Sequence, residues 1–186
     1  MEQKYSPGVE TLFLTLNQLF DLNKHSPLVI KNKLKEVNIH HVLYLCKEFG
    51  VDSIHLYNFV WTTDGPKNEP DDGFEDLGVD SAFNELIVNL NIYPEFVDDL
   101  REKSLLKNIN EQIFKIEPLI NSFVFINPAL TKGNWVKLLA SVSYLKYVSH
   151  FDLAMIMREV GKNQPNGQKY VTLIVKMLDK YKALLN

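Results

Sequence analysis

A chain of 186 residues, with 46% hydrophobic residues, 23% charged residues and a net charge of −3, has the composition of one ordinary globular domain. This composition excludes disordered, collagen-like and low-complexity proteins. No apolar run is long enough to span a membrane, and the first four residues lack the features of a signal peptide, so we expect a cytoplasmic protein without a membrane segment. The single cysteine, Cys46, excludes an internal disulfide.

Two helix-start signals lie near the beginning of the chain. Ser6-Pro7 and Ser26-Pro27 each place an N-cap residue before a proline in the first helical turn. Apolar residues recur at three- and four-residue steps after the first of these signals. The sequence therefore predicts helices over about 6–20 and 26–37.

A third helix and a short strand are predicted next. Asn38 is a favourable N-cap, the apolar residues after it fall on one helical face, and Gly50 ends the pattern. Residues 57–63 are rich in aromatic and β-branched residues and run into the turn signal Asp64-Gly65-Pro66. We expect a helix over 38–49, then a strand or extended segment.

Helical spacing of apolar residues dominates the second half of the chain. Tyr93-Pro94 and Pro118 interrupt it, and Ser149 with Asp152 forms a weak capping box for one helix. The expected helices cover residues 82–90, 134–145, 149–160 and 170–185, with a polar turn over 161–167.

These elements together predict the fold class. We expect a mainly α protein, a compact multi-helix bundle with a short β segment near residues 57–63. Residues 1–186 would form a single domain, within which residues 131–186 could be a C-terminal helical subdomain.

Motifs for catalysis, cofactor binding and metal binding are missing from the sequence. The stretch Gly161–Lys169 lacks the spacing of a phosphate-binding loop, and no G-x-S-x-G elbow occurs. Cys46 lies on the apolar stripe of its helix, which predicts a buried and inert thiol. His40 and His41 would point about 100° apart on a helix, so they cannot share a metal ion. We expect no enzyme, no cofactor and no metal site.

Charge is distributed unevenly along the chain. Residues 131–186 hold nine Lys and Arg against three Asp and Glu, whereas seven carboxylates and one lysine lie between Asp64 and Asp80. The acidic stretch lacks the residue order of a calcium loop, so a solvated loop or a docking face for a basic partner is favoured. The aromatic residues of segment 57–61 alternate, which places them on one strand face that either packs onto helices or binds a partner. The candidate partner-binding residues are Asp64, Asp71, Asp72, Glu75, Asp76, Tyr57 and Trp61.

The basic C-terminal third supports an alternative hypothesis. A helix that ends near Val160, a turn of six or seven residues and a second helix are similar to a helix-turn-helix pair. This turn is longer than the usual one, and arginine, which commonly reads guanine edges, is nearly absent. The alternative is therefore DNA binding through Lys169, Lys176 and Lys180.

Several short pieces of the chain resemble one family of proteins. The pieces are Ile39–Cys46, Phe49–Asp52, Tyr57–Phe59, Asp64–Pro66 and Trp135–Val142. They resemble the YwgA-type proteins and the related phage-associated SocA/Panacea group, in which an apolar helix leads to an aromatic segment and a Gly-Pro turn.

The resemblance implies a mainly helical cytoplasmic protein, often carried by phages or mobile elements, that binds other proteins as an antitoxin or a proteolytic adaptor. It transfers no catalytic residue to this chain. The sequence therefore predicts a non-enzymatic protein-interaction module whose partner is another protein, with homodimerisation left open.

Overall fold

The computed structural model describes residues 15–17, 29, 32, 38–50, 57–69, 79–92, 115–127 and 129–185. Within these ranges the protein is mainly helical with one small antiparallel sheet, so the predicted fold class is confirmed. The predicted helices over 6–20 and 26–37 lie largely outside the described residues. Their described parts, Thr15–Asn17, Val29 and Asn32, are helical.

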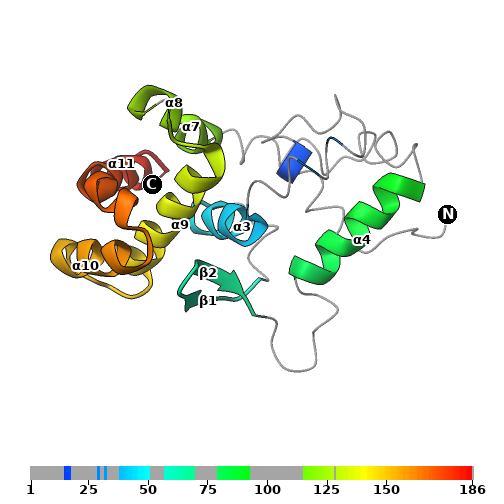
Figure 1. Ribbon diagram of the computed structural model, residues 1–186, viewed down its shortest axis with the longest axis horizontal. Helices are drawn as coiled ribbons and strands as arrows, with labels where there is room; N and C mark the ends of the chain where they lie inside the picture. Colours follow the sequence, from blue (N-terminus) through cyan, green and yellow to red (C-terminus); the bar gives the residue numbers. More distant parts are fainter. Residues whose placement is uncertain are drawn as a thin grey trace.

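The elements follow in chain order (Figure 1). They are α3 (Ile39–Glu48), β1 (Phe59–Thr62), β2 (Gly65–Asn68), α4 (Val79–Ile92), α7 (Glu117–Asn121), α8 (Phe123–Ile126), α9 (Lys132–Tyr147), α10 (Leu153–Asn163), the 3₁₀ helix η4 (Pro165–Tyr170) and α11 (Val171–Leu185). None of the helices in the described ranges is long and apolar enough to cross a membrane.

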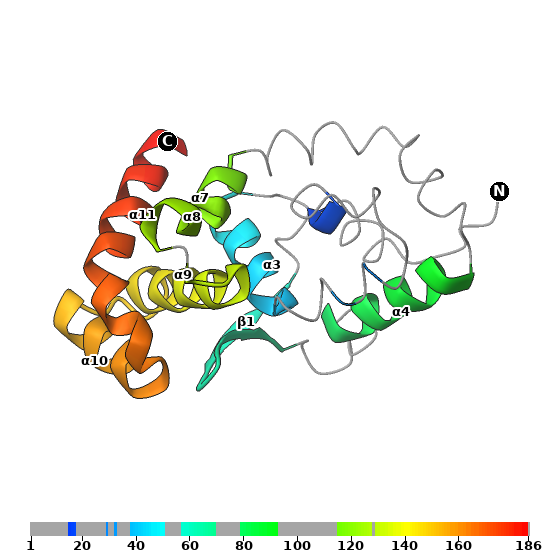
Figure 2. The same cartoon turned by 45° about the horizontal axis from the view of Figure 1, so that its top comes forward.

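Helix α9 is the centre of the described structure. It packs against α3, β2, α7, α10 and α11, and Figure 2 shows it between α10 and α3. Trp135 is fully buried, and its indole Nε1 donates to the Leu119 carbonyl at 3.2 Å. Because neighbours cover it on several sides, α9 buries an unbroken run of residues instead of a single stripe. Its N-cap is Thr131, whose side chain accepts from the Asn134 backbone N–H.

Helix α3 forms as its sequence pattern predicts. The side chain of Asn38 caps it by accepting from the backbone N–H of His40 at 2.9 Å. The helix ends before Gly50, whose φ of 87° lies in the region that favours glycine. Its residues from Ile39 to Cys46 are buried, mostly against α9 and β2.

The hairpin β1–β2 contains a strand that the sequence pattern did not predict. Phe59 pairs with Asn68 and Thr62 with Gly65, in antiparallel register. The backbone N of Asn68 points away from β1 and donates to His40 Nδ1 at 3.2 Å. Pro66, two residues earlier on the strand, faces the same side, so its missing N–H costs no hydrogen bond to β1.

The C-terminal helices pack on α9, and their boundaries differ from the predicted ones. The helix expected from Ser149 begins at Leu153, because Asp152 is the N-cap and accepts from the backbone N–H of Met155 at 2.8 Å. The capping box with Ser149 as N-cap was therefore wrong. Helix α10 extends to Asn163 and η4 begins at Pro165, so the predicted polar turn over 161–167 is wrong except at Gln164, which lies between the two helices.

Candidate functional site

The predicted acidic surface is only partly described. Asp71, Asp72, Glu75 and Asp76 lie outside the described residues. Asp64 lies in the hairpin turn, exposed, with Oδ1 2.5 Å from Lys137 Nζ on α9. The hydrogen bond and the positive charge of Lys137 lower the pKa of Asp64.

The aromatic face of the hairpin packs onto the helices. Tyr57 and Phe59 are each 8% exposed, and the Phe59 ring lies 5.6 Å from the Tyr44 ring, edge to face. Trp61 is half-buried with its ring 5.7 Å from that of Tyr144. Of the two predicted aromatic contact residues, Tyr57 is therefore occupied by the core, and only Trp61 retains substantial exposed surface.

His40, the first of the two adjacent histidines, connects the hairpin to α4. His40 Nε2 lies 3.0 Å from Asp80 Oδ1 on α4, while its Nδ1 accepts from the Asn68 backbone. These contacts require the tautomer with the proton on Nε2. Burial lowers the pKa of His40, although Asp80 opposes this. In the described ranges, no group of three or more His, Cys, Asp or Glu residues could hold a metal ion.

His41 and Ser141 lie together beneath Gly65. The side chain of His41 is 2% exposed, and a Cβ on Gly65 would lie 2.9 Å from His41 Nε2 and 3.0 Å from Ser141 Oγ. Ser141 Oγ accepts from Gln164 Nε2 at 3.0 Å. Burial lowers the pKa of His41 to about 4, so it is neutral near pH 7. The hairpin covers His41 and Ser141, and these two side chains lie against its turn at Gly65.

The single thiol is equally enclosed. Cys46 is fully buried in α3, and burial raises its pKa to about 12. A thiol in this state carries almost no thiolate near pH 7, so it is a poor nucleophile. The predicted burial of Cys46 is confirmed.

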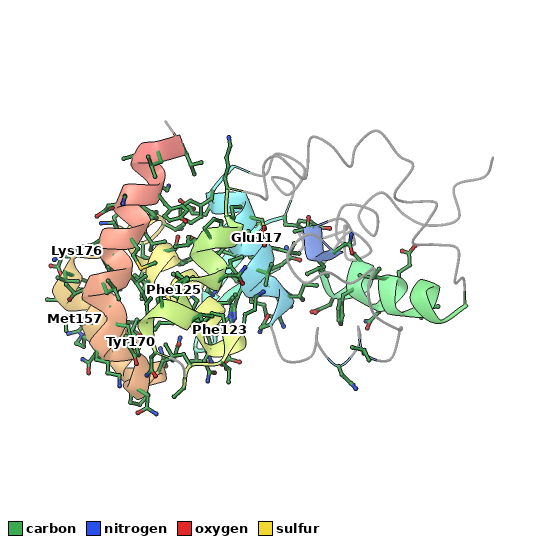
Figure 3. All side chains as sticks on the ribbon, turned by 90° about the horizontal axis from the view of Figure 1, so that it is seen from above. Glu117, Phe123, Phe125, Met157, Tyr170 and Lys176 are labelled. Atoms are coloured by element: carbon green, nitrogen blue, oxygen red, sulfur yellow. The ribbon has the colours of Figure 1, made fainter. Side chains whose placement is uncertain are left out.

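The three lysines of the DNA-binding hypothesis are exposed. Lys169 lies on η4 with its Nζ 5.0 Å from the Tyr170 ring centroid. Lys176 and Lys180 lie four residues apart on α11, and Figure 3 shows Lys176 on the outer side of that helix. The segment between α10 and α11 spans residues 164–170 and contains η4, so it is longer than the turn of a helix-turn-helix.

An exposed apolar surface on α8 and α11 escaped the sequence analysis. We call it the α8–α11 face, and it consists of Val124 (55% exposed), Phe125 (92%), Leu173 (41%) and Leu184 (72%). Asn127 at the end of α8 donates through Nδ2 to the hydroxyl of Tyr170, the last residue of η4, at 2.7 Å, which joins the end of α8 to the residue before α11. Figure 3 shows Phe125 and Tyr170 on this side of the molecule.

A signal for this surface exists in the sequence. Four apolar residues in a row, from Phe123 to Ile126, form a single helical turn. One turn of helix points side chains in all directions, so it cannot bury four consecutive residues on one side. Such a turn buries all four residues only where neighbours cover several of its sides, as they do for α3 and α9, and in α8 Val124 and Phe125 are exposed.

A groove runs along the C-terminal half of α11. It has a volume of about 540 Å³, and among the described residues its lining is mainly apolar with two lysines. The described lining residues are Lys115, Met177, Lys180, Tyr181, Leu184 and Leu185.

Comparison with known proteins adds no family assignment. The chain matches no protein-family model, no curated protein and no solved structure.

Proposed function

We propose that this chain is a non-enzymatic protein-interaction module of the cytoplasm and that its α8–α11 face contacts the partner protein. The observation that carries the proposal is the exposure of Phe125, of which 92% is open to solvent, beside the exposed Val124. Large apolar side chains that gather on neighbouring elements are typical of interaction sites. Aromatic residues in particular are enriched among the residues that dominate binding energy.

The energetics favour a contact of this kind. Burying a Phe or Leu side chain that is otherwise exposed contributes roughly 1.5–3 kcal/mol, so Phe125 and Leu184 alone could anchor a partner. Three polar contacts near the hairpin lie within the protein: His40 with Asp80, Asp64 with Lys137, and Ser141 with Gln164. The exposed apolar side chains of the α8–α11 face are therefore available for binding, while the polar contacts near the hairpin support the fold.

The resemblance to the YwgA and SocA/Panacea group suggests the kind of partner. We propose an antitoxin-like or adaptor-like role of phage or mobile-element origin, in which the partner is a toxin or a protein delivered to a protease. The acidic residues Asp71, Asp72, Glu75 and Asp76, with Asp64 and Trp61, stay a predicted second contact with a basic region of that partner.

Quantitative capture of the natural partner tests the proposal. Phe125→Asp should reduce capture at least about tenfold, because it places a charge where the partner needs an apolar anchor. The matched control is Leu153→Asp, which alters an exposed leucine on α10. It should leave capture unchanged.

The thermal unfolding of both variants should match that of the unchanged chain, since both positions are exposed. Capture that survives Phe125→Asp contradicts the role of the α8–α11 face. Loss only on reversal of Asp71, Asp72, Glu75 and Asp76 to Lys would instead place the contact on the acidic surface.

DNA binding is the second candidate, favoured by the exposure of Lys169, Lys176 and Lys180. Phosphate contacts make such binding fall steeply with salt. A gel shift with duplex DNA at low salt that Lys176→Glu weakens would support it. Absence of any shift at low salt would eliminate this candidate.

A further inference from the structure

The groove beside α11 combines apolar side chains with lysines in its described lining. We infer that it receives an amphipathic helix of the partner protein whose apolar face is flanked by Asp and Glu. This inference rests on the proposed function and deepens it, because it names the shape and the charge of the partner segment. It concerns the groove lined by Met177, Tyr181 and Leu184, and Leu184 belongs to both this groove and the α8–α11 face.

The apolar side of the groove is a half-buried side of α11, where Met177 and Tyr181 pack against the core and the Tyr181 ring lies 6.5 Å from the Phe49 ring, edge to face. Ile174 and Leu178 are fully buried where α11 packs on its neighbours α9 and α10. Met177, Tyr181 and Leu184 follow one another at steps of four and three residues, so they form a stripe along the helix. A second helix that carries apolar residues at the same steps would lie along this stripe, as in helix-in-groove recognition.

The second wall of the groove comes from the start of α7. Lys115 lies two residues before α7, and both α7 and α11 pack on α9. Figure 2 shows α7 and α11 on the same side of α9. The described lining of the groove therefore comes from α11 and from Lys115, which belongs to a separate part of the chain.

The charge of the groove determines the partner's charge. Lys115 and Lys180 are the charged residues of the described lining, and Asp179 points elsewhere, with Oδ1 3.1 Å from Lys146 Nζ and 3.0 Å from the Tyr147 hydroxyl. Lysines at the edge of an apolar groove attract carboxylates and repel other cations. Lys176, exposed one turn before Lys180, extends this basic edge.

A small amphiphile such as a fatty acid has matching chemistry but a poorer fit. Leu184 is 72% exposed although it lines the groove, so the groove is open along one side. A ligand the size of a fatty acid would leave much of this leucine in water. A helix, about 10 Å wide with its side chains, would cover it together with the neighbouring surface.

The test uses a designed probe and the full chain. The probe is a fluorescein-labelled peptide of about 18 residues, with Leu at every third or fourth position and Glu at the intervening ones. The control peptide keeps the Leu positions and replaces Glu with Lys. Fluorescence anisotropy should show saturable binding of the acidic peptide and at least about tenfold weaker binding of the basic one.

Matched variants locate the binding. Leu184→Asp and Lys180→Glu should each weaken binding of the acidic peptide about tenfold. Leu153→Asp and Lys162→Glu on α10 make the same changes outside the groove and should leave it unchanged. Circular dichroism melting confirms that each variant folds.

Three outcomes would overturn the inference. They are absence of saturable binding by the acidic peptide, equal binding of the two peptides, and equal loss in the control variants. Saturable binding of dodecanoate without binding of the acidic peptide would show that the groove takes a small amphiphile instead. If Phe125→Asp abolishes capture of the natural partner while the acidic peptide fails to bind, the proposed function stands and this inference fails.

Discussion

At the scale of single residues, Gly65 determines how closely the hairpin approaches α3 and α9. Its φ is 111°, and a Cβ would lie 2.9 Å from His41 Nε2. Gly65→Ala should therefore lower the free energy of unfolding by about 2–3 kcal/mol, from backbone strain plus displacement of the His41 ring. Gly50 provides the control, because its φ is 87° but nothing lies within 4 Å of its added Cβ.

Gly50→Ala should cost only the backbone strain, about 1 kcal/mol. Urea denaturation of the two variants separates the contributions. An equal cost at both positions would show that the clash of the added Cβ with His41 contributes nothing to the cost of Gly65→Ala. The sequence identifies Gly65 as a turn residue, but its contact with His41, 24 positions earlier, depends on the tertiary fold.

His41 makes stability depend on pH. Burial lowers its pKa from 6.5 to about 4. Above pH 6.5 His41 is therefore neutral in both the folded and the unfolded chain, and its ionisation does not change the free energy of unfolding there. Between pH 6.5 and about 4 the unfolded chain binds a proton that the folded chain does not. The free energy of unfolding should fall there by about 1.4 kcal/mol per pH unit, or about 3 kcal/mol in all.

Urea denaturation between pH 4 and 7 measures this dependence. His41→Gln should make the decline shallower, while the part due to His40, whose pKa is also lowered, should remain. The same slope in His41→Gln and in the unchanged chain would contradict the buried neutral state of His41.

At the scale of elements, the sequence predicts the helices whose ends and apolar stripes are defined by neighbouring residues in the chain. Asn38 and Gly50 mark α3, and apolar periodicity marks α9 and α11, because caps and stripes depend on neighbouring residues. Strand β2 was missed because Gly65 and Pro66 disfavour strands by propensity. They are tolerated there because β1 on one side and His40 on the other provide the partners that β2 needs.

A polar network joins α11 to α3 and α9. Lys182 pairs with Glu48 and lies 4.0 Å from the ring centroid of Tyr147, whose hydroxyl donates to Asp179. Lys182→Met should lower the free energy of unfolding by about 1–2 kcal/mol, because the side chain of Glu48 is only 15% exposed and would lose its ion pair.

Lys162→Met is the control for this prediction. Lys162 pairs with Glu159 three residues earlier on the surface of α10, so its loss should cost roughly 0.3 kcal/mol. Guanidinium denaturation compares the two variants. Equal costs would show that the network does not hold α11 in place.

At the scale of the whole molecule, the uneven charge has two uses. Lys137 and Lys182 belong to the basic C-terminal third and pair with Asp64, at the start of the acidic stretch 64–80, and with Glu48 at the end of α3. The basic third is therefore attracted within the fold to acidic residues earlier in the chain. Lysines on the outer side of α11, such as Lys180, are exposed, which leaves them available to a partner.

The candidate site could be predicted from the sequence only in part. Apolar periodicity shows that α11 has two faces, but it does not reveal that Leu173 and Leu184 lie outside the packed one. Exposure of Phe125 likewise depends on where α8 lies against α9 and α11. The apolar run from Phe123 to Ile126 is a signal in the sequence, but which of these residues are exposed, and which residues of α11 are exposed with them, depends on the tertiary arrangement.

Hydrogen–deuterium exchange of the full chain, with and without its natural partner, tests the central claim most directly. If the α8–α11 face binds the partner, exchange slows on binding in residues 123–126 and 171–185, which contain this face and the α11 side of the groove. Slower exchange confined to the hairpin and the acidic residues that follow it, with α8 and α11 unchanged, would contradict that claim.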